Sequence, residues 1–365
     1  MRLLLYEHLS ALGGTDLSGG ASAALALEGL AMLEGIVEDF SQLPDVQVVV
    51  PPAAWCDWNP PACVQVLRGD PERSVIESLS DWLSEIDAVL VVAPESEGIL
   101  EALTRQVETA GVRNLGSSSL AVRLAADKLL TARRLEERSV PTIETWGLAE
   151  RGVVKIERYS EWVTGIGNRP VMIKPRYGAG SQLMTVHREL PTLPEMNRFI
   201  SEGEMDRDSI LQPYIDAIPL SVAVWCEGND RDYAAMAIGD QLFGDEMKFE
   251  YRGGVVPSQR LAWSPQRIVE IRDLAVEACR CVPGLRGYVG VDLILPKGEQ
   301  GQALVCEINP RLTTSYLGYR VLSLSNPAAQ WLQFTPETLD LRGLPIRFHC
   351  DGTIEPYESA EEGLS

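Results

Sequence analysis

The sequence predicts an α/β domain of parallel strands and helices, followed by a larger α+β region built on antiparallel sheets. Strand-like and helix-like segments alternate up to about residue 118, which is the pattern of a parallel sheet with helices on its faces. Beyond that point, strand-like segments follow one another through short polar turns, which indicates antiparallel hairpins. The length of 365 residues also exceeds one ordinary domain, so we expect two or three.

Composition excludes several classes of function. Thirty-two basic residues against 52 acidic ones give a formal charge of −20, which disfavours a nucleic-acid partner. The seven cysteines form no CxxC pair, so neither a zinc ribbon nor a redox motif is predicted. The N-terminal apolar run is too short for a signal peptide, and no uninterrupted apolar stretch of about 18 residues follows. We therefore expect a cytoplasmic protein that does not bind membranes.

The first third reads as a Rossmann-like unit. Continuous apolar runs rich in β-branched residues predict strands buried on both faces, and apolar positions at helical spacing predict the helices between them. Residues 55–61 are rich in proline and are expected to form a loop. The predicted strands are 3–6, 46–50 and 88–92, and the predicted helices are 21–40, 75–83 and 99–109.

The sequence after about residue 118 has a different pattern, that of an α+β region with antiparallel sheets. Short polar turns at 227–231 and 296–301 predict hairpins, and the acidic, apolar-poor segment 351–365 is expected to be disordered. The predicted strands are 171–174, 184–187, 210–215, 221–226, 233–238, 289–295 and 303–308, and the predicted helices are 127–138, 195–200, 266–281 and 325–332.

Three oxygen-bearing side chains fall on the last predicted hairpin. Glu307 and Asn309 are two residues apart on one strand, so they leave the same face, and pairing through the turn can bring Asp292 alongside them. Two carboxylates and an amide oxygen suit Mg²⁺ or Mn²⁺. Considered without its context, the same pattern also fits a solvated strand face.

A second cluster contains a lysine and a glycine-rich loop. Lys174 ends an apolar strand, and Gly178, Gly180 and Ser181 follow it. Small residues let backbone N–H groups approach phosphate oxygens, and the lysine supplies a positive charge. The segment matches neither a P-loop nor a dinucleotide fingerprint, and considered separately it also fits a hairpin turn.

Two further segments complete the pattern. Lys128 follows Asp127 at a predicted helix start, where backbone N–H groups favour phosphate. Gln212 is the amide side chain at the end of an apolar strand, where an adenine edge can be recognised.

The order of these segments resembles the ATP-grasp superfamily, and the resemblance covers essentially the whole chain. The four segments are 116–128, 174–181, 210–216 and 292–311. The resemblance implies an ATP-grasp fold with an N-terminal, Rossmann-like pre-ATP-grasp domain and two α+β subdomains that grip ATP. The implied divisions are 1–118 for the pre-ATP-grasp domain, 119–215 for the central subdomain, 216–350 for the C-terminal subdomain with the metal site, and 351–365 for the tail.

The resemblance also implies the site residues. Lys128 and Lys174 would hold the ATP phosphates, and 178–181 would be a mobile loop closing over them. The adenine would lie against Gln212 and the backbone of Tyr214 and Ile215. The metal ions, Mg²⁺ or Mn²⁺, would be held by Asp292, Glu307 and Asn309.

Some positions depart from the family pattern. Pro219 occupies the usual ribose-contacting glutamate position, and Asp216 is the expected substitute. Gly290 occupies a position where some amino-acid ligases carry arginine, so Arg311 is the expected grip on the transferred phosphate. Lys248 and Arg252 would supply further charge; each of these three cations also fits an ordinary surface residue.

Three segments resemble a narrower branch that includes tyramine–glutamate ligases, namely 3–14, 251–257 and 307–316. This implies an enzyme that joins a small-molecule carboxylate to an amine, such as glutamate to tyramine. The amide would form through an acyl phosphate, with release of ADP and phosphate. An ATP-dependent carboxylase and a non-catalytic ATP-binding module remain alternatives, and homodimerisation is left open. We expect the acceptor site between 7–20, 250–257 and 311–320.

Overall fold

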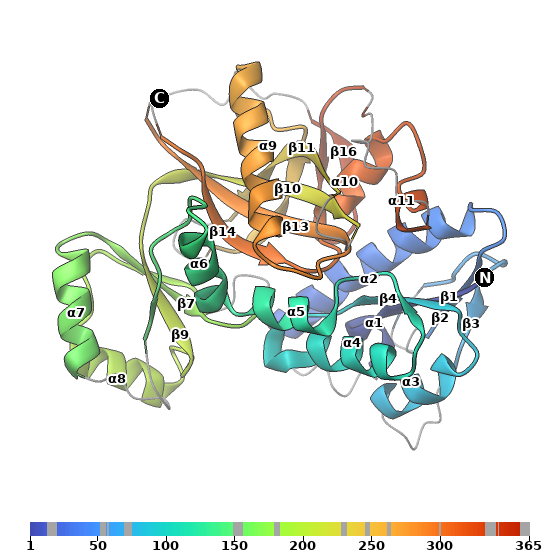
Figure 1. Cartoon of the computed structure of the whole chain (residues 1–365), viewed down its shortest axis with the longest axis horizontal. Coiled ribbons are helices and arrows are strands. Elements are labelled where there is room, and N and C mark those ends of the chain that lie inside the picture. Colours follow the sequence, from blue (N-terminus) through green and yellow to red (C-terminus); the bar gives the residue numbers. More distant parts are fainter. Residues whose placement is uncertain are drawn as a thin grey trace.

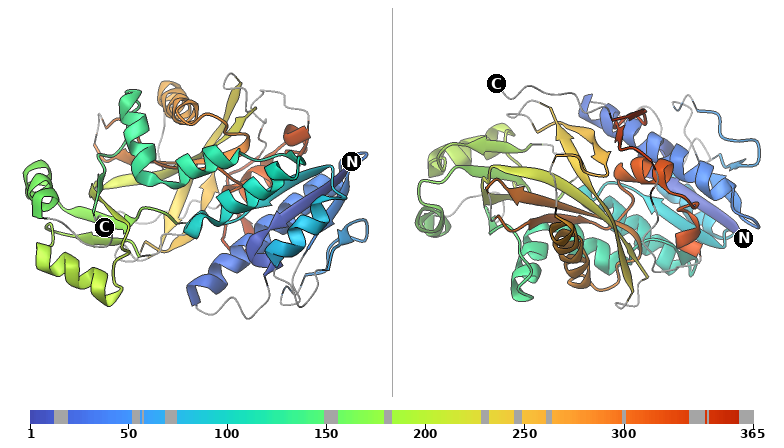
Figure 2. Two further views of the ribbon diagram at one scale, coloured as in Figure 1. Left: turned by 60° about the horizontal axis from the view of Figure 1, so that its bottom comes forward. Right: turned by 90° about the horizontal axis from the view of Figure 1, so that it is seen from above.

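The chain is built on three β-sheets, as Figure 1 shows for the computed structural model. The structure describes residues 1–12, 20–51, 56, 58–68, 75–148, 156–178, 183–227, 232–244, 249–260, 264–298, 301–332, 341 and 343–357. Figure 2 shows that the N-terminal unit and the region with α7 (Ile156–Ile166) and α8 (Leu193–Glu202), drawn in green, lie at opposite ends of the molecule.

The first sheet is parallel and belongs to the N-terminal unit. Its strand order is β3-β2-β1-β4-β5, and β4 is buried along its whole length, as the continuous apolar pattern predicts. The strands are β1 (Arg2–Glu7), β2 (Gln47–Val50), β3 (Gln65–Val66), β4 (Ala88–Val92) and β5 (Arg113–Asn114). The helices are α1 (His8–Ala11), α2 (Gly20–Ser41), α3 (Val75–Leu83), the 3-10 helix η2 (Ser96–Gly98) and α4 (Ile99–Thr109).

The second sheet has four antiparallel strands in the order β6-β9-β7-β8, and it forms the small unit at the left of Figure 1. Its core contains the fully buried Trp162. The strands are β6 (Trp146–Gly147), β7 (Val171–Pro175), β8 (Thr185–His187) and β9 (Ser209–Pro213), and the helices are α7 (Ile156–Ile166) and α8 (Leu193–Glu202). Two helices precede it, α5 (Ser119–Ala126) and α6 (Lys128–Glu137).

The third sheet has the order β14-β13-β10-β11-β12-β15-β16. Side chains alternate across it: Val222 and Val224 of β10 face the core that includes α9, whereas Trp225 faces the N-terminal unit. The strands are β10 (Ala217–Cys226), β11 (Tyr233–Phe243), β12 (Tyr251–Val256), β13 (Gly287–Pro296), β14 (Leu304–Asn309), β15 (Ile346–Phe348) and β16 (Ile354–Pro356). The helices are α9 (Pro265–Arg280), α10 (Ser315–Leu322) and α11 (Ala329–Leu332).

A polar cluster fastens α10 to the N-terminal unit. Arg320 donates to both carboxylate oxygens of Asp39 on α2, at 2.8 Å each, and Tyr316 donates to Asp39 at 2.6 Å. Trp331 packs on Phe40 with ring centroids 5.5 Å apart. The third sheet is thereby packed against the first.

The structure also corrects the sequence predictions at several places. The sequence patterns did not predict strands β3, β5, β6, β12, β15 and β16, helices α1, α5, α7 and α10, or the 3-10 helix η2. The prediction of a disordered tail is wrong for Ile354–Pro356, because this segment pairs with β15; residues 358–365 lie outside the described residues. The domain boundaries at 118, 215 and 350 stay predictions. No helix in the described part of the chain has the length and apolar character that a membrane crossing requires.

Candidate active site

A cavity of about 620 Å³ lies where the three sheets meet. The parallel sheet contributes Glu7 and Val92 to its wall, the four-stranded sheet contributes Lys174 and Gln212, and the seven-stranded sheet contributes Asp292. Most of the residues predicted from the sequence line this single space.

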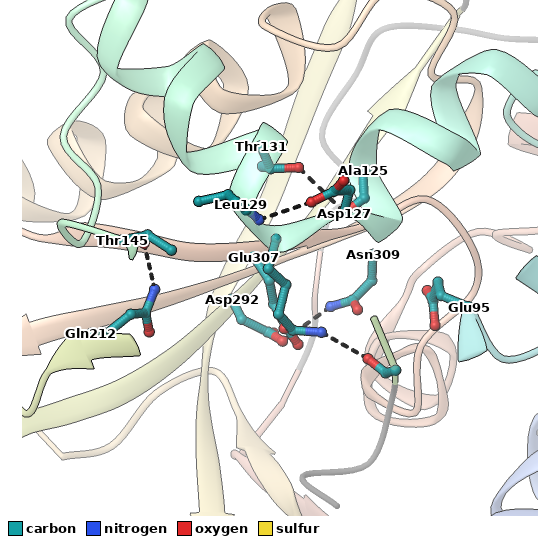
Figure 3. A network of polar contacts seen from close by, with 12 residues as sticks. Glu95, Ala125, Asp127, Leu129, Thr131, Thr145, Gln212, Asp292, Glu307 and Asn309 are labelled. Carbon is teal, nitrogen blue, oxygen red and sulfur yellow. Dashed lines mark hydrogen bonds and ion pairs between the residues drawn. The ribbon is translucent and has the colours of Figure 1, made fainter. Parts of the chain in front are cut away.

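The predicted oxygen trio is assembled on β13 and β14. Asp292 and Glu307 stand directly opposite each other in the antiparallel pair, and Asn309 follows on the same strand as Glu307. Asn309 Nδ2 donates to Asp292 Oδ2 at 3.0 Å, and Gln241 Nε2 donates to Asp292 Oδ1 at 2.8 Å. Figure 3 shows the three side chains converging on one point.

The two predicted lysines face this trio. Lys128 Nζ lies 3.2 Å from Glu307 Oε2 and donates to the carbonyl oxygen of Gly178 at 2.8 Å. Lys174 is only 6% exposed. Burial opposes ionisation of Glu307, but Lys128 and Lys174 outweigh it and lower the Glu307 pKa to about 2.

The pKa of Asp292, the carboxyl group opposite Glu307, is shifted in the opposite direction. Burial raises the pKa of Asp292, and the neighbouring Glu307 charge raises it further. Two partly buried carboxylates side by side favour a divalent cation between them, because the cation removes their repulsion.

The donor set fits a hard cation. Two carboxylates and an amide are the oxygen ligands that Mg²⁺ and Mn²⁺ prefer. The described residues contain no group of three or more His, Cys, Asp or Glu side chains that could hold a metal. Because the trio has only two acids, further ligands must come from phosphate oxygens and water.

Asp127 holds the start of α6 and so positions Lys128. Its Oδ1 accepts from the backbone N–H groups of Leu129 and Leu130, each at 3.1 Å. Arg176 Nε donates to the same carboxylate at 2.7 Å, and the Tyr177 hydroxyl donates at 3.1 Å. Although burial opposes it, the Arg176 contact keeps the Asp127 pKa below its usual range. The helix start was predicted from the Asp-Lys pair, but the link to Arg176 was not.

The other end of the cavity carries the residues expected at adenine. Gln212, Tyr214 and Ile215 line it, and Gln212 Nε2 donates to Thr145 Oγ1 at 2.8 Å. This hydrogen bond fixes the Gln212 amide on the inner side of β9 (Figure 3). Apolar side chains beside it include Ile143 and Met172.

The substitute expected at the ribose is not brought to this cavity. Asp216 does not line the cavity, and its carboxylate is 67% exposed and pairs with Lys297 at 2.8 Å. Pro219 lines the wall instead.

Of the cations predicted to act on the phosphate, Arg311 lines the cavity and Arg252 does not. Arg311 lines the cavity and is held by Glu95: its Nε lies 2.9 Å from Glu95 Oε1 and its Nη2 lies 2.9 Å from Oε2. Arg252, by contrast, is exposed, pairs with Glu250 at 3.3 Å and does not line the cavity.

Part of the prediction falls on residues that the structure does not place. Gly180, Ser181 and Lys248 lie outside the described residues. Gly178, the first residue of the predicted loop, lines the cavity.

Sequence reasoning missed other cavity residues. Glu95 follows β4, and Gln241 lies on β11, far in the chain from the partners that they hold. Glu28 on α2 also lines the cavity. No local pattern marks these residues, because each is defined by a partner on another element.

Family comparison agrees with this geometry. A model of the ATP-grasp domain matches residues 125–315, which is more than half of the chain. The chain belongs to the ATP-grasp family. A model of the pre ATP-grasp 3 domain matches residues 46–122. The predictions of family and fold class are therefore confirmed.

Individual relatives cover most of the chain. A tyramine–L-glutamate ligase from Methanocaldococcus fervens is 25% identical over 323 residues, 87% of this chain and 89% of the relative. A D-alanine–D-alanine ligase from Carboxydothermus hydrogenoformans is 24% identical over 261 residues, 69% of this chain and 80% of the relative. The crystal structure of an ATP-grasp superfamily protein from Archaeoglobus fulgidus matches with a TM-score of 0.66 and 25% identity, covering 100% of this chain and 95% of that one.

Proposed function

We propose that this ATP-grasp protein is an ATP-dependent carboxylate–amine ligase that forms an amide through an acyl phosphate and releases ADP and phosphate. The observation that carries the proposal is the convergence of Lys128, Lys174, the Asp292–Glu307–Asn309 trio and Arg311 on one cavity. The class agrees with the sequence prediction, since relatives over most of the chain are ligases by name.

In this proposal one end of the cavity binds the adenine and the other end binds the phosphates. Gln212 and the backbone at Tyr214 and Ile215 bind the adenine. Lys174, which is buried, and Lys128, which is partly buried, attract the phosphates, because limited contact with water strengthens their electrostatic interactions.

Phosphoryl transfer takes place at the trio. Mg²⁺, when bound by Asp292, Glu307 and Asn309, supplies positive charge that neutralises the β- and γ-phosphates. Arg311 stabilises the transferring phosphoryl group, and Glu95 holds its guanidinium in place through two contacts.

The substrate carboxylate attacks the γ-phosphorus, the bond from this phosphorus to the β,γ-bridging oxygen breaks, and ADP leaves. The amine nitrogen then attacks the acyl carbon, with phosphate as the leaving group. This chemistry requires no side-chain nucleophile. It requires exclusion of water, since water would hydrolyse the acyl phosphate. By analogy with the relatives, glutamate and tyramine are the first substrates to test.

The test is a screen of carboxylates and amines with ATP and Mg²⁺, starting from glutamate and tyramine, with ADP, AMP and phosphate all measured. We expect ADP and phosphate only when both substrates are present, and loss of turnover in Glu307→Ala. Glu202→Gln, which changes an exposed side chain at the end of α8, is the control and should keep full activity.

Other products would identify the alternatives. AMP and pyrophosphate would contradict the acyl-phosphate route. Turnover that depends on bicarbonate would indicate a carboxylase. ATP binding without turnover across the panel would indicate a binding module.

A further inference from the structure

The cavity ends in an acidic region on the N-terminal unit. Glu7, at the end of β1, and Glu28, on α2, both line it. The Glu7 carboxylate packs against α2 next to Glu28, because a Cβ at Gly29 would lie 2.6 Å from it. Both of these residues are acidic, whereas the other part of the cavity carries Lys128 and Lys174 beside Asp292 and Glu307.

The two acids differ in how they are satisfied. Glu7 is fully engaged: Oε1 accepts from Leu9 N at 3.2 Å and Oε2 accepts from Ser10 N at 2.6 Å, which caps α1. Glu28 accepts one hydrogen bond, from the Thr314 hydroxyl, through Oε1. Within the described part of the chain, no hydrogen bond reaches Glu28 Oε2 and no cation pairs with Glu28.

Within the described residues, the cation whose charge acts on Glu28 is already paired with another acid. Arg311 influences Glu28 electrostatically but is held by both oxygens of Glu95. Burial raises the pKa of Glu28, and the Thr314 and Arg311 interactions only partly oppose this. A carboxylate in this environment lacks the cation that would offset its loss of water.

Two apolar side chains lie beside Glu28 on α2. Leu25 and Met32 are three residues before and four after it, so they lie on the same face of α2, and both line the cavity. Tyr251, across the cavity on β12, senses the Glu28 charge. A ligand here would meet the Glu28 carboxylate, whose Oε2 accepts no hydrogen bond within the described part of the chain, and an apolar wall.

Glu28 also lies next to the reaction centre. Its partner Thr314 belongs to the segment that directly follows β14, the strand that carries Glu307 and Asn309. Arg311 responds to the charges of both Glu28 and Glu307, so the acid and the trio flank one guanidinium.

We propose that Glu28 binds the ammonium group of the amine substrate and accepts the proton that this group must lose, with Leu25, Met32 and Tyr251 holding an apolar or aromatic body. This inference rests on the proposed ligase function. It assigns the substrate class as a primary amine on an apolar or aromatic group.

The proton balance follows. The ammonium loses one proton to the Glu28 carboxylate, and its freed nitrogen lone pair forms the C–N bond with the acyl carbon. The C–O bond to phosphate breaks, and phosphate leaves with the bonding electrons. The nitrogen then loses its second proton to the departing phosphate.

Hydroxylamine separates this proposal from the ligase function itself, because it is uncharged at neutral pH and traps acyl phosphates as hydroxamates without needing an ammonium site. With glutamate as the carboxylate, we expect Glu28→Gln to keep the wild-type rate of hydroxamate formation. Its rate of amide formation with tyramine should fall at least about 100-fold. Equal losses with both nucleophiles would overturn the proposal. Absence of hydroxamate with the wild-type protein would contradict the ligase function with this carboxylate, and the Glu28 proposal is then decided by binding alone.

Binding is measured by calorimetry with tyramine and with 4-ethylphenol, which lacks the amine. We expect Glu28→Gln to weaken tyramine binding about 10- to 100-fold, as loss of a charge-assisted hydrogen bond predicts, and to leave 4-ethylphenol binding unchanged. Glu34→Gln, on the same helix as Glu28 but outside the cavity lining, is the matched control and should bind tyramine as the wild type does. Equal tyramine affinity in wild type and Glu28→Gln, or no tyramine binding by wild type, would overturn the proposal.

Discussion

The ion pair between Arg311 and Glu95 is buried, and we predict that this burial makes it important for the stability of the fold. The Arg311 side chain is 12% exposed and that of Glu95 is 4% exposed, and the shortest contact is 2.9 Å. At this separation and an effective dielectric constant of about 20, the gross Coulomb attraction is about 6 kcal/mol. Removing one partner of such a buried pair typically costs 3–5 kcal/mol, because the other charge remains without compensation.

The perturbation is Glu95→Gln, which keeps the shape and one acceptor oxygen but removes the charge. We therefore expect the lower end of that range, a loss of about 3 kcal/mol in the free energy of unfolding. The chain supplies a matched control in Asp216→Asn, because Asp216 and Lys297 are separated by 2.8 Å but are 67% and 62% exposed. An exposed pair contributes at most about 1 kcal/mol.

The assay is urea unfolding followed by tryptophan fluorescence, at low and high salt. Glu95→Gln should lower the unfolding midpoint clearly at both salt concentrations, since burial limits screening. Asp216→Asn should leave the midpoint almost unchanged. Equal small effects of the two substitutions would refute the argument that Arg311 is held in a buried, charge-compensated position.

Three further predictions concern the sheet, the helix start and the metal. Gly253→Ala should lower the free energy of unfolding by more than about 2 kcal/mol in urea unfolding, because its φ is +108° and a Cβ would lie 2.0 Å from the Phe348 carbonyl oxygen. The control Gly343→Ala, where φ is +82° and a Cβ would meet no atom of the described residues beyond its chain neighbours within 4 Å, should cost only about 1 kcal/mol. Similar costs for the two substitutions would contradict this prediction. The pKa of Asp127 is lowered in the folded state, so the stabilisation from its charge is present above the unfolded pKa of about 3.9 and is lost as pH falls through the folded value. The difference in free energy of unfolding between wild type and Asp127→Asn should therefore shrink below about pH 4. A difference that stays constant with pH would contradict this prediction. EDTA should abolish ADP formation, and added Mg²⁺ should restore it. Asn309→Ala should raise the Mg²⁺ concentration needed for half-maximal rate about tenfold, equivalent to about 1.4 kcal/mol. An unchanged Mg²⁺ concentration would exclude Asn309 as a ligand.

The elements that could be predicted are those whose pattern is local. Continuous apolar runs predicted β2 and β4, and helical spacing predicted α2, α3 and α4. The Asp292–Glu307 pairing was also predictable, because β13 and β14 are joined by a short turn that sets their register.

The elements that were missed depend on distant contacts. Strand β12 contains Gly253 and Gly254, which weaken strand propensity, yet a Cβ at either position would collide with Phe348 or the backbone. Strand β16 is short and acidic, and its order comes from pairing with β15. No sequence pattern links Arg311 to Glu95, which is 216 residues away.

Oxygen transfer from the carboxylate to phosphate tests the central claim, phosphoryl transfer within the cavity that holds the two lysines and the Asp292–Glu307–Asn309 trio. The substrate carboxylate is labelled with ¹⁸O, the reaction is run with ATP, Mg²⁺ and the amine, and the phosphate is examined by ³¹P NMR. An acyl-phosphate route predicts one ¹⁸O atom in the phosphate released with ADP. Amide formation with unlabelled phosphate, or with label in AMP, would contradict it.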